Sequence, residues 1–285
     1  MKPTTLTILA VLALGAGFAT RPAAADAPAT VIEVSASSIG LQPGNVYGPW
    51  QFATLDVRTT AGADDLPGFT LVTRHDLDSG APSSGTSGIL DDYHQWTPRL
   101  FTYAQIEFSS GTLFPTRGAY LEADPTVSPN VVIAEGYGVL DVPIGLVTPV
   151  DLTQRYVNVG PEFYFPNGSV TVRYIPLWTQ GQVSASSLQG NLSFGNERSM
   201  LTTLSLQSGV LPAYAATNPA IAAEFQDRVL AANLSVKRWV SSRFGFELGV
   251  DAAHASDRFT GKSVYDSLGA TLGVFVGVGH SSKMP

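Results

Sequence analysis

The stretch "RFGFELGVDAAHA", residues 243–255, places large apolar side chains at every second position. Phe244, Phe246, Leu248 and Val250 share one parity, and the positions between them hold only glycine or a carboxylate. Successive side chains of a β-strand point to opposite faces, so this stretch predicts a strand with one apolar face and one small, acidic face. The fold class then depends on what covers the apolar face.

The same alternation recurs along most of the chain after residue 25. Counting such segments predicts about fourteen strands of roughly ten residues, the length that crosses a bilayer when tilted. Without the two weakest segments, at Gly85 and Arg117, about twelve strands would remain. The expected strands start near Thr30, Pro49, Gly68, Gly85, Arg99, Arg117, Asn130, Val150, Gly168, Val183, Ser199, Arg228, Arg243 and Ser263.

The composition narrows the class of protein. The chain has 285 residues, a formal net charge of −7 and a charged fraction of only 14%, whereas soluble domains average about 25%. The absence of cysteine excludes a disulfide scaffold and any Cys-based metal or redox site. Phosphate binding needs clustered Lys and Arg. Because no such cluster occurs, we do not expect nucleic acid as a partner.

The N-terminus has the features of an export signal. Lys2 precedes the apolar run from Leu6 to Ala19, and the small residues Ala23 to Ala25 fit a cleavage site. We therefore predict a signal peptide over residues 1–25 and a barrel domain over 26–285. The alternative is an N-terminal membrane anchor, but the apolar run is shorter than the ~20 residues that a spanning helix needs.

A soluble β-sandwich also alternates, with its apolar faces against a protein core. The polar faces of this chain, however, are rich in Gly, Ser and Asn and poor in the Lys and Glu of a solvated surface. In lipid the backbone must satisfy its hydrogen bonds internally, so the sheet must close. We therefore predict an all-β fold, a closed antiparallel transmembrane up-and-down β-barrel. Aromatic residues near strand ends predict interfacial girdles: Trp50, Tyr103, Phe163, Phe165, Trp178, Trp239, Phe244 and Phe246.

The connections between strands provide a second indication. Tight turns are expected near Asn167, Asn196 and Ser241, on the side of the chain termini. Longer connections are expected on the opposite side, from Val210 to Asp227 and after Asp257. Such an asymmetry of loop length is typical of outer-membrane barrels and is not expected of a sandwich.

Two parts of the sequence resemble a known family. The run from "YVNVGPEFYFPNG" to "MLTTLSLQSG" is similar to the middle and late strands of the YaiO-type outer-membrane β-barrel family. The segments "LSVKRWVSSRFGFELGVDAAHA" and "YDSLGATLGVFVGV" resemble its closing strands. The resemblance implies export to the bacterial outer membrane, with membrane lipid and the barrel-assembly machinery as partners. Relatives of this type are associated with surface polysaccharide systems.

The alternation also assigns side chains to the two faces of the wall. The predicted lumen residues are Asp56, Arg58, Arg74, Asp76, Glu107, Glu122, Glu135, Glu162, Arg173, Lys237, Glu247 and Asp251. The predicted lipid-facing residues are Phe244, Phe246, Leu248, Val250, Leu272 and Val274. Carboxylates in the lumen would favour cations or a polyhydroxylated chain. The alternative is a structural ladder of acid–base pairs, because unpaired charges in a confined lumen are costly.

Three functions are compatible with such a barrel. We expect a transport or export pore for a polysaccharide or small solute, and the first alternative is a non-conducting barrel that displays external loops. The second alternative is a lipid hydrolase at the external rim, where His254 lies near Ser256 and Asp257. Sequence neighbours rarely supply Ser–His–acid geometry, and no "GxSxG" elbow is present. We therefore predict no enzyme, no catalytic residue, no metal site and no cofactor.

Overall fold

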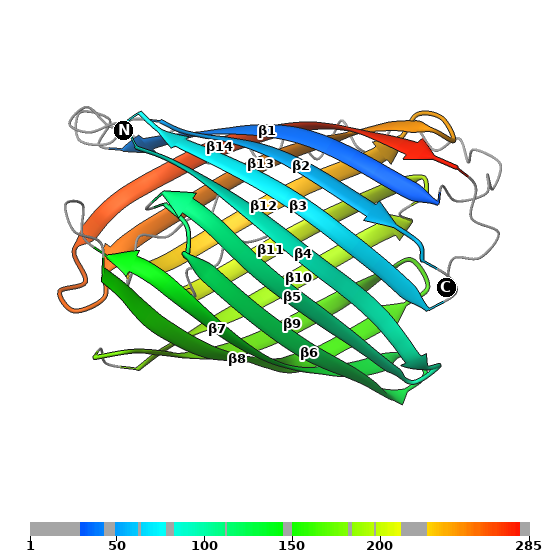
Figure 1. Cartoon of the computed structure of the whole chain (residues 1–285), viewed down its shortest axis with the longest axis horizontal. Helices are drawn as coiled ribbons and strands as arrows, with labels where there is room; N and C mark the ends of the chain where they lie inside the picture. Colours follow the sequence, from blue (N-terminus) through cyan, green and yellow to red (C-terminus); the bar gives the residue numbers. More distant parts are fainter. Residues whose placement is uncertain are drawn as a thin grey trace.

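The computed structural model describes residues 29–42, 49–61, 64–77, 83–111, 113–144, 150–181, 184–196, 198–211 and 227–279. Within these ranges, fourteen antiparallel strands close into one barrel (Figure 1). The strands are β1 (Thr30–Gln42), β2 (Trp50–Thr59), β3 (Asp65–Asp76), β4 (Ser83–Thr97), β5 (Leu100–Gly111), β6 (Arg117–Ser128), β7 (Val131–Ile144), β8 (Val150–Phe165), β9 (Gly168–Thr179), β10 (Ala185–Asn196), β11 (Met200–Val210), β12 (Asp227–Trp239), β13 (Phe244–Asp257) and β14 (Ser263–Val278).

The pairing of β1 with β14 closes the ring. Its register runs without interruption from Thr30 opposite Val278 to Gln42 opposite Asp266. Every other pairing joins strands that are consecutive in the sequence. No strand of the described chain is left with an open edge, which is the condition for a sheet to exist in hydrocarbon. The predicted closed up-and-down barrel is confirmed.

The alternation located the strands closely. Each described strand begins within three residues of its expected start, and the two weakest segments are strands β4 and β6. The barrel therefore has fourteen strands and not twelve. The described ranges contain no helix long and apolar enough to span a membrane.

The two ends of the barrel differ in the length of their connections. Turns of two to five residues join the strands at the end where β1 begins, and connections of five to sixteen residues lie at the other end. The expected tight turns near Asn167, Asn196 and Ser241 all belong to the short-turn end. Outer-membrane barrels point short turns to the periplasm and longer loops outward. We therefore name the two ends periplasmic and external.

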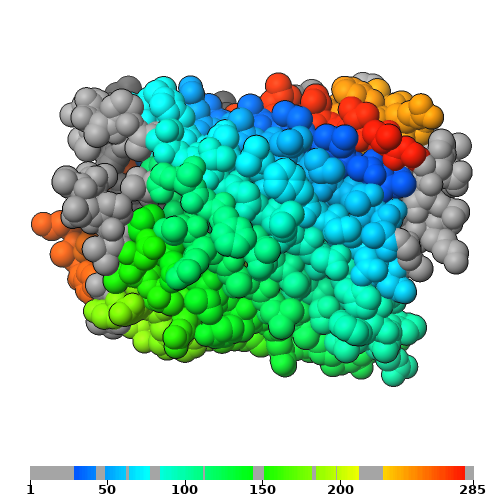
Figure 2. All heavy atoms as spheres, in the orientation of Figure 1, coloured from blue at the N-terminus to red at the C-terminus, as the bar shows by residue number. Residues whose placement is uncertain are grey.

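The outer face of the wall is apolar. Leu121, Leu188, Leu206 and Leu272 are each more than half exposed, at strand positions that point away from the lumen. Figure 2 shows the side of the wall that β1 to β7 form as a continuous surface. Large hydrophobic side chains are exposed on strands all around the barrel, and a contiguous exposed apolar surface marks contact with a membrane or a partner. The outer face also holds the residues assigned to lipid: Phe244, Phe246, Leu248, Val250, Leu272 and Val274.

The aromatic residues divide between the two faces. Phe163, Phe165, Trp178 and Phe244 lie on the outer face near strand ends, 39–46% exposed, and Phe246 shares that face. Trp50, Tyr103 and Trp239 point inward, so their assignment to the girdle is wrong. Position near a strand end does not determine the face. Parity does, and each of these three shares its parity with inner-face residues of its own strand.

We expect a charge on the outer face to be costly and the same charge on the inner face to be tolerated. Leu206→Arg, halfway along β11 and 51% exposed, should lower the free energy of unfolding by about 2–4 kcal/mol, because the cation must enter hydrocarbon. The neighbouring inner-face change Ser205→Arg should cost much less. Urea titration of both variants in lipid vesicles measures the difference. Equal losses would contradict the assignment of the two faces.

Candidate functional site

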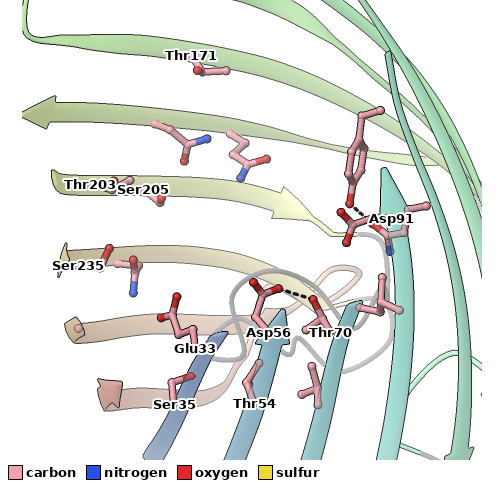
Figure 3. Close-up of a pocket in the computed structure, with 18 of the residues that line it drawn as sticks. Glu33, Ser35, Thr54, Asp56, Thr70, Asp91, Thr171, Thr203, Ser205 and Ser235 are labelled. Carbon is pink, nitrogen blue, oxygen red and sulfur yellow. Dashed lines mark hydrogen bonds between the residues drawn. The ribbon is translucent and has the colours of Figure 1, made fainter. Parts of the chain in front are cut away.

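The lumen contains a chamber of about 690 Å³, lined by residues from every strand except β7. Figure 3 shows part of its wall, where the side chains of Glu33, Asp56 and Thr70 lie close together. About half of the lining residues are Ser, Thr, Asn or Gln, whose side chains carry hydroxyl or amide groups. Such groups both donate and accept hydrogen bonds, which suits water or a polar solute. They are Ser35, Ser37, Thr54, Thr70, Gln105, Asn158, Thr171, Gln189, Asn191, Ser193, Thr203, Ser205, Gln207, Asn233, Ser235 and Thr271.

Acids predominate among the charged groups that line the chamber. Clefts lined by one sign of charge and enclosed by low-dielectric walls concentrate the electrostatic potential. With all groups ionised, the described lining carries three more negative than positive charges, so the chamber attracts cations. The carboxylates are Glu33, Asp56, Asp91, Glu122 and Glu247, and the cations are Arg58 and Lys237.

The two cations bridge acids on different strands. Lys237 Nζ on β12 lies 2.7 Å from Glu33 Oε2 and 3.8 Å from Glu247 Oε2. Arg58 Nη1 on β2 donates a hydrogen bond of 2.7 Å to Asp91 Oδ1. A ladder of acid–base pairs therefore exists on the wall, but the carboxylates that line the chamber outnumber the cations.

A row of four tyrosines crosses the wall beside these charges. The ring centroids of Tyr93 and Tyr103 are 4.5 Å apart, and those of Tyr103 and Tyr120 are 6.0 Å apart. Tyr120 and Tyr156 are stacked at 5.7 Å. The Tyr120 hydroxyl donates a hydrogen bond to Glu122, which joins the row to the acids. The row was not predicted from the sequence, although a tyrosine on the polar parity of four separate strands was a visible signal.

Strand β7 does not line the chamber because two of these tyrosines cover it. A Cβ at Gly136 would overlap the Tyr120 ring, and a Cβ at Gly138 would overlap the Tyr156 ring. This packing places the glycines of β7 on the inner face and Glu135 on the outer face, where it is exposed. The prediction of Glu135 as a lumen residue is therefore wrong. It assumed that a charge marks the inner parity, whereas here the tyrosine rings require glycine on that parity.

The structure brings together only some of the predicted lumen residues. Five of the twelve line the chamber: Asp56, Arg58, Glu122, Lys237 and Glu247. Six others lie on the inner face without lining it: Arg74, Asp76, Glu107, Glu162, Arg173 and Asp251. Among these six, Arg173 lies 3.9 Å from Glu162, and Asp251 accepts a hydrogen bond from Asn233.

The external part of the lumen is packed with apolar side chains. Ile39, Trp50, Phe52 and Tyr265 are at most 4% exposed and belong to one cluster that spans β12 to β14 and β1 to β4. Arg74 lies over this cluster, with its guanidinium 4.2 Å from the Trp50 ring centroid. Its Nε and Nη2 atoms each donate a 2.7 Å hydrogen bond to Asp76.

A second apolar cluster lies at the same end on other strands. Leu140, Val142, Ile175 and Leu177 on β7 and β9 are 2–6% exposed. Side chains on the inner wall of an open pore would be accessible to water from the lumen. Their burial means that apolar packing narrows the lumen between the polar chamber and the external end.

Among the described residues, no group of three or more His, Asp or Glu side chains is arranged to hold a metal ion.

Comparison with known proteins gives one family and a set of similar folds. The model of the YaiO membrane beta barrel domain matches residues 30–214, and no match was found among the curated proteins compared. The monoaromatic hydrocarbon channel CymD superposes with a TM-score of 0.61 at 8% identity, over 89% of this chain and 90% of CymD. The P. putida toluene transporter TodX superposes with a TM-score of 0.54 at 9% identity, over 89% of this chain and 91% of TodX. At these identities the likeness is one of fold.

The packing of Tyr156 on Gly138 gives a test of the inner wall. Gly138→Ala should lower the free energy of unfolding by about 1–3 kcal/mol, because the methyl group overpacks against the ring. In a Tyr156→Ala background the same change should cost little. Gly190→Ala is the control, since its Cβ would have no neighbour closer than 3.9 Å. Urea titrations in vesicles that show equal costs at both glycines would contradict the described packing.

Proposed function

The chain belongs to the YaiO family of membrane β-barrels in the outer membrane, and we propose that its lumen is a pathway for small polar solutes, with a carbohydrate chain as the cargo. The observation that carries this proposal is the chamber itself. It combines hydroxyl and amide groups, an excess of carboxylates and a row of tyrosines in about 690 Å³, a volume within the usual range for ligand sites.

The tyrosine row supports a carbohydrate rather than water and ions alone. A sugar ring presents apolar C–H groups on its face and hydroxyls around its edge. Tyrosine offers a large amphipathic surface for the face, and Tyr93 is 42% exposed within the lumen. Carboxylates and amides such as Glu122 and Asn158 lie beside the row and can accept or donate hydrogen bonds to the hydroxyls.

The names of the similar structures do not transfer to this chamber. CymD and TodX are named as a hydrocarbon channel and a toluene transporter. A hydrocarbon would leave the hydroxyls and carboxylates of the chamber without hydrogen-bond partners, which is unfavourable for binding. The chemistry of the lining therefore favours a polar cargo.

The apolar packing at the external end supports a second candidate function, a non-conducting barrel that displays its external loops. Trp50 is only 2% exposed and is held by the Tyr265 ring at 5.6 Å and by Arg74. Passage through the lumen requires this packing to move. Conductance measurements separate the two candidates.

In planar bilayers we expect a small conductance that increases severalfold in Trp50→Ala, because the change removes the largest side chain of the external packing. Trp178→Ala is the matched control, since Trp178 is 45% exposed on the outer face and should leave the conductance unchanged. Inserted protein that stays silent both as wild type and as Trp50→Ala would favour the non-conducting barrel.

The charge of the chamber predicts cation selectivity. Under a KCl gradient the reversal potential should lie toward that of potassium, because the lining has five carboxylates and two cations. The double variant Glu122→Gln, Glu247→Gln should move it toward zero. Glu135→Gln changes a carboxylate on the outer face and serves as the control. An anion-selective wild type, or an equal shift in the control, would refute this account of the chamber.

A further inference from the structure

We propose that the outer face of β13 and β14, at the external end of the barrel, carries a serine-hydrolase site for acyl esters of anionic lipids. Its residues are Ser256 as nucleophile, His254 as general base and Asp266 as the acid that orients the histidine. The loop between β13 and β14, orange in Figure 1, lies directly beyond it. The site faces lipid and not the lumen, so the proposal does not depend on conduction.

The pairing of β13 with β14 forms the His–Asp pair. His254 and Asp266 are register partners, and His254 Nδ1 lies 2.7 Å from Asp266 Oδ1. Both side chains are exposed, at 49% and 65%. An acid bound at Nδ1 leaves Nε2 free to accept a proton, which is the orientation that Ser–His–acid chemistry needs.

Ser256 lies on the same face as His254. Two positions along a strand return to one face, and Ser256 is also the register partner of Arg228, which is exposed on the outer face of β12. The register against β14 shifts between Ala255 and Ser256, where a β-bulge leaves Val264 on β14 as the extra residue. Bulges of this kind redirect side chains and are common beside active sites. The Ser256 hydroxyl has one long contact, 3.4 Å to the Arg228 carbonyl oxygen, and the proposed reaction requires it to turn from this carbonyl toward His254 Nε2.

The surroundings fit a membrane lipid. Leu230 is the register partner of His254 and is 63% exposed, and Leu268, two residues after Asp266, is 70% exposed. Leu230 flanks His254 at the same level on β12, and Leu268 lies further along β14 toward the membrane interior, where acyl chains run. Arg228, the register partner of Ser256, lies nearer the external end than Leu230, on the side where anionic headgroups would lie. A guanidinium binds phosphate oxygens strongly.

The reaction that this geometry allows is acyl transfer to water. The Ser256 oxygen attacks the ester carbonyl carbon while its proton moves to His254 Nε2, and Asp266 stabilises the resulting imidazolium. The tetrahedral intermediate then breaks the bond to the alcohol oxygen, which takes the proton from His254. Water repeats the sequence on the acyl-serine, with His254 accepting and returning a proton, and releases the fatty acid.

Asp257, which the sequence suggested as the acid, has a different role. Its Oδ1 accepts hydrogen bonds from the backbone N–H of Phe259 at 3.1 Å and of Thr260 at 2.6 Å. It therefore orders the turn that follows the strand. The acid that reaches His254 comes from the next strand and is ten residues away from Ser256 in the sequence, so the sequence alone could not identify it.

A second outward His–Asp pair provides a matched control. His94 Nδ1 lies 2.5 Å from Asp65 Oδ1 at the periplasmic end of the barrel. The positions two residues before and after His94 hold Asp92 and Trp96, so this pair has no serine on its face. His94→Ala removes an equivalent ion pair without touching the proposed site.

The test uses the folded protein in vesicles of phosphatidylethanolamine and phosphatidylglycerol, and separately in vesicles that contain lipopolysaccharide. Released fatty acid is measured by mass spectrometry, and a fluorophosphonate probe reports an activated serine by covalent labelling. We expect release and labelling at Ser256, with release about 10²- to 10⁴-fold lower in His254→Ala, abolished in Ser256→Ala and unchanged in His94→Ala. The lipid that yields fatty acid identifies the source of the ester.

The labelling of the wild type requires no variant to fold, which keeps the proposal open to refutation. Absence of label at Ser256, or label that persists in a folded His254→Ala protein, would overturn it. So would absence of release from both lipids, or release that continues in Ser256→Ala. Heat-modifiable gel migration confirms that each variant has formed a closed barrel.

Discussion

The structure depends on one constraint, that no backbone N–H or C=O can remain unpaired in hydrocarbon. A sheet meets it only by closing, and here β1 and β14 meet along thirteen consecutive register pairs from Thr30–Val278 to Gln42–Asp266. Once the ring is closed, each strand has an inside and an outside. The side chains of every strand are then sorted by parity into those that contact lipid and those that contact the lumen.

The outer and inner faces restrict their side chains differently. This difference explains why the strands could be predicted from the sequence more closely than the lumen residues. Most outward positions between the strand ends contact lipid, so an apolar parity recurs and identifies each strand start within three residues. The inner face has no such uniform rule. An inner position can hold serine, glutamate, tyrosine or tryptophan, depending on the space that the side chains of neighbouring strands leave in the lumen. For this reason Glu135 was wrongly predicted to face the lumen. The inner positions of its strand are glycines, because tyrosine rings of the two adjacent strands pack directly on them.

Residues that act together across strands were beyond the reach of the sequence. Tyr93, Tyr103, Tyr120 and Tyr156 approach one another only because the ring places β4, β5, β6 and β8 on one arc of the wall. Register decides such contacts, and a shift by one residue moves a side chain to the other face. His254 could be assigned to the rim from its position in the strand. Its partner Asp266 could be found only from the register of β13 against β14.

The two parts of the lumen differ in polarity: the chamber is lined by charged and hydroxyl groups, and the external part is packed with apolar side chains. The chamber has more carboxylates than cations, whereas the external packing is apolar, and moving an ion into such surroundings costs several kcal/mol. Under the proposed function, a polar cargo would therefore cross only after Trp50 and its neighbours move. Arg74 offers a way for them to move, because its two hydrogen bonds to Asp76 stay within β3 while its contact with Trp50 crosses to β2. Displacement of Trp50 breaks its cation–π contact with Arg74 but leaves the Arg74–Asp76 ion pair intact. The packing can therefore open without leaving a buried charge unpaired.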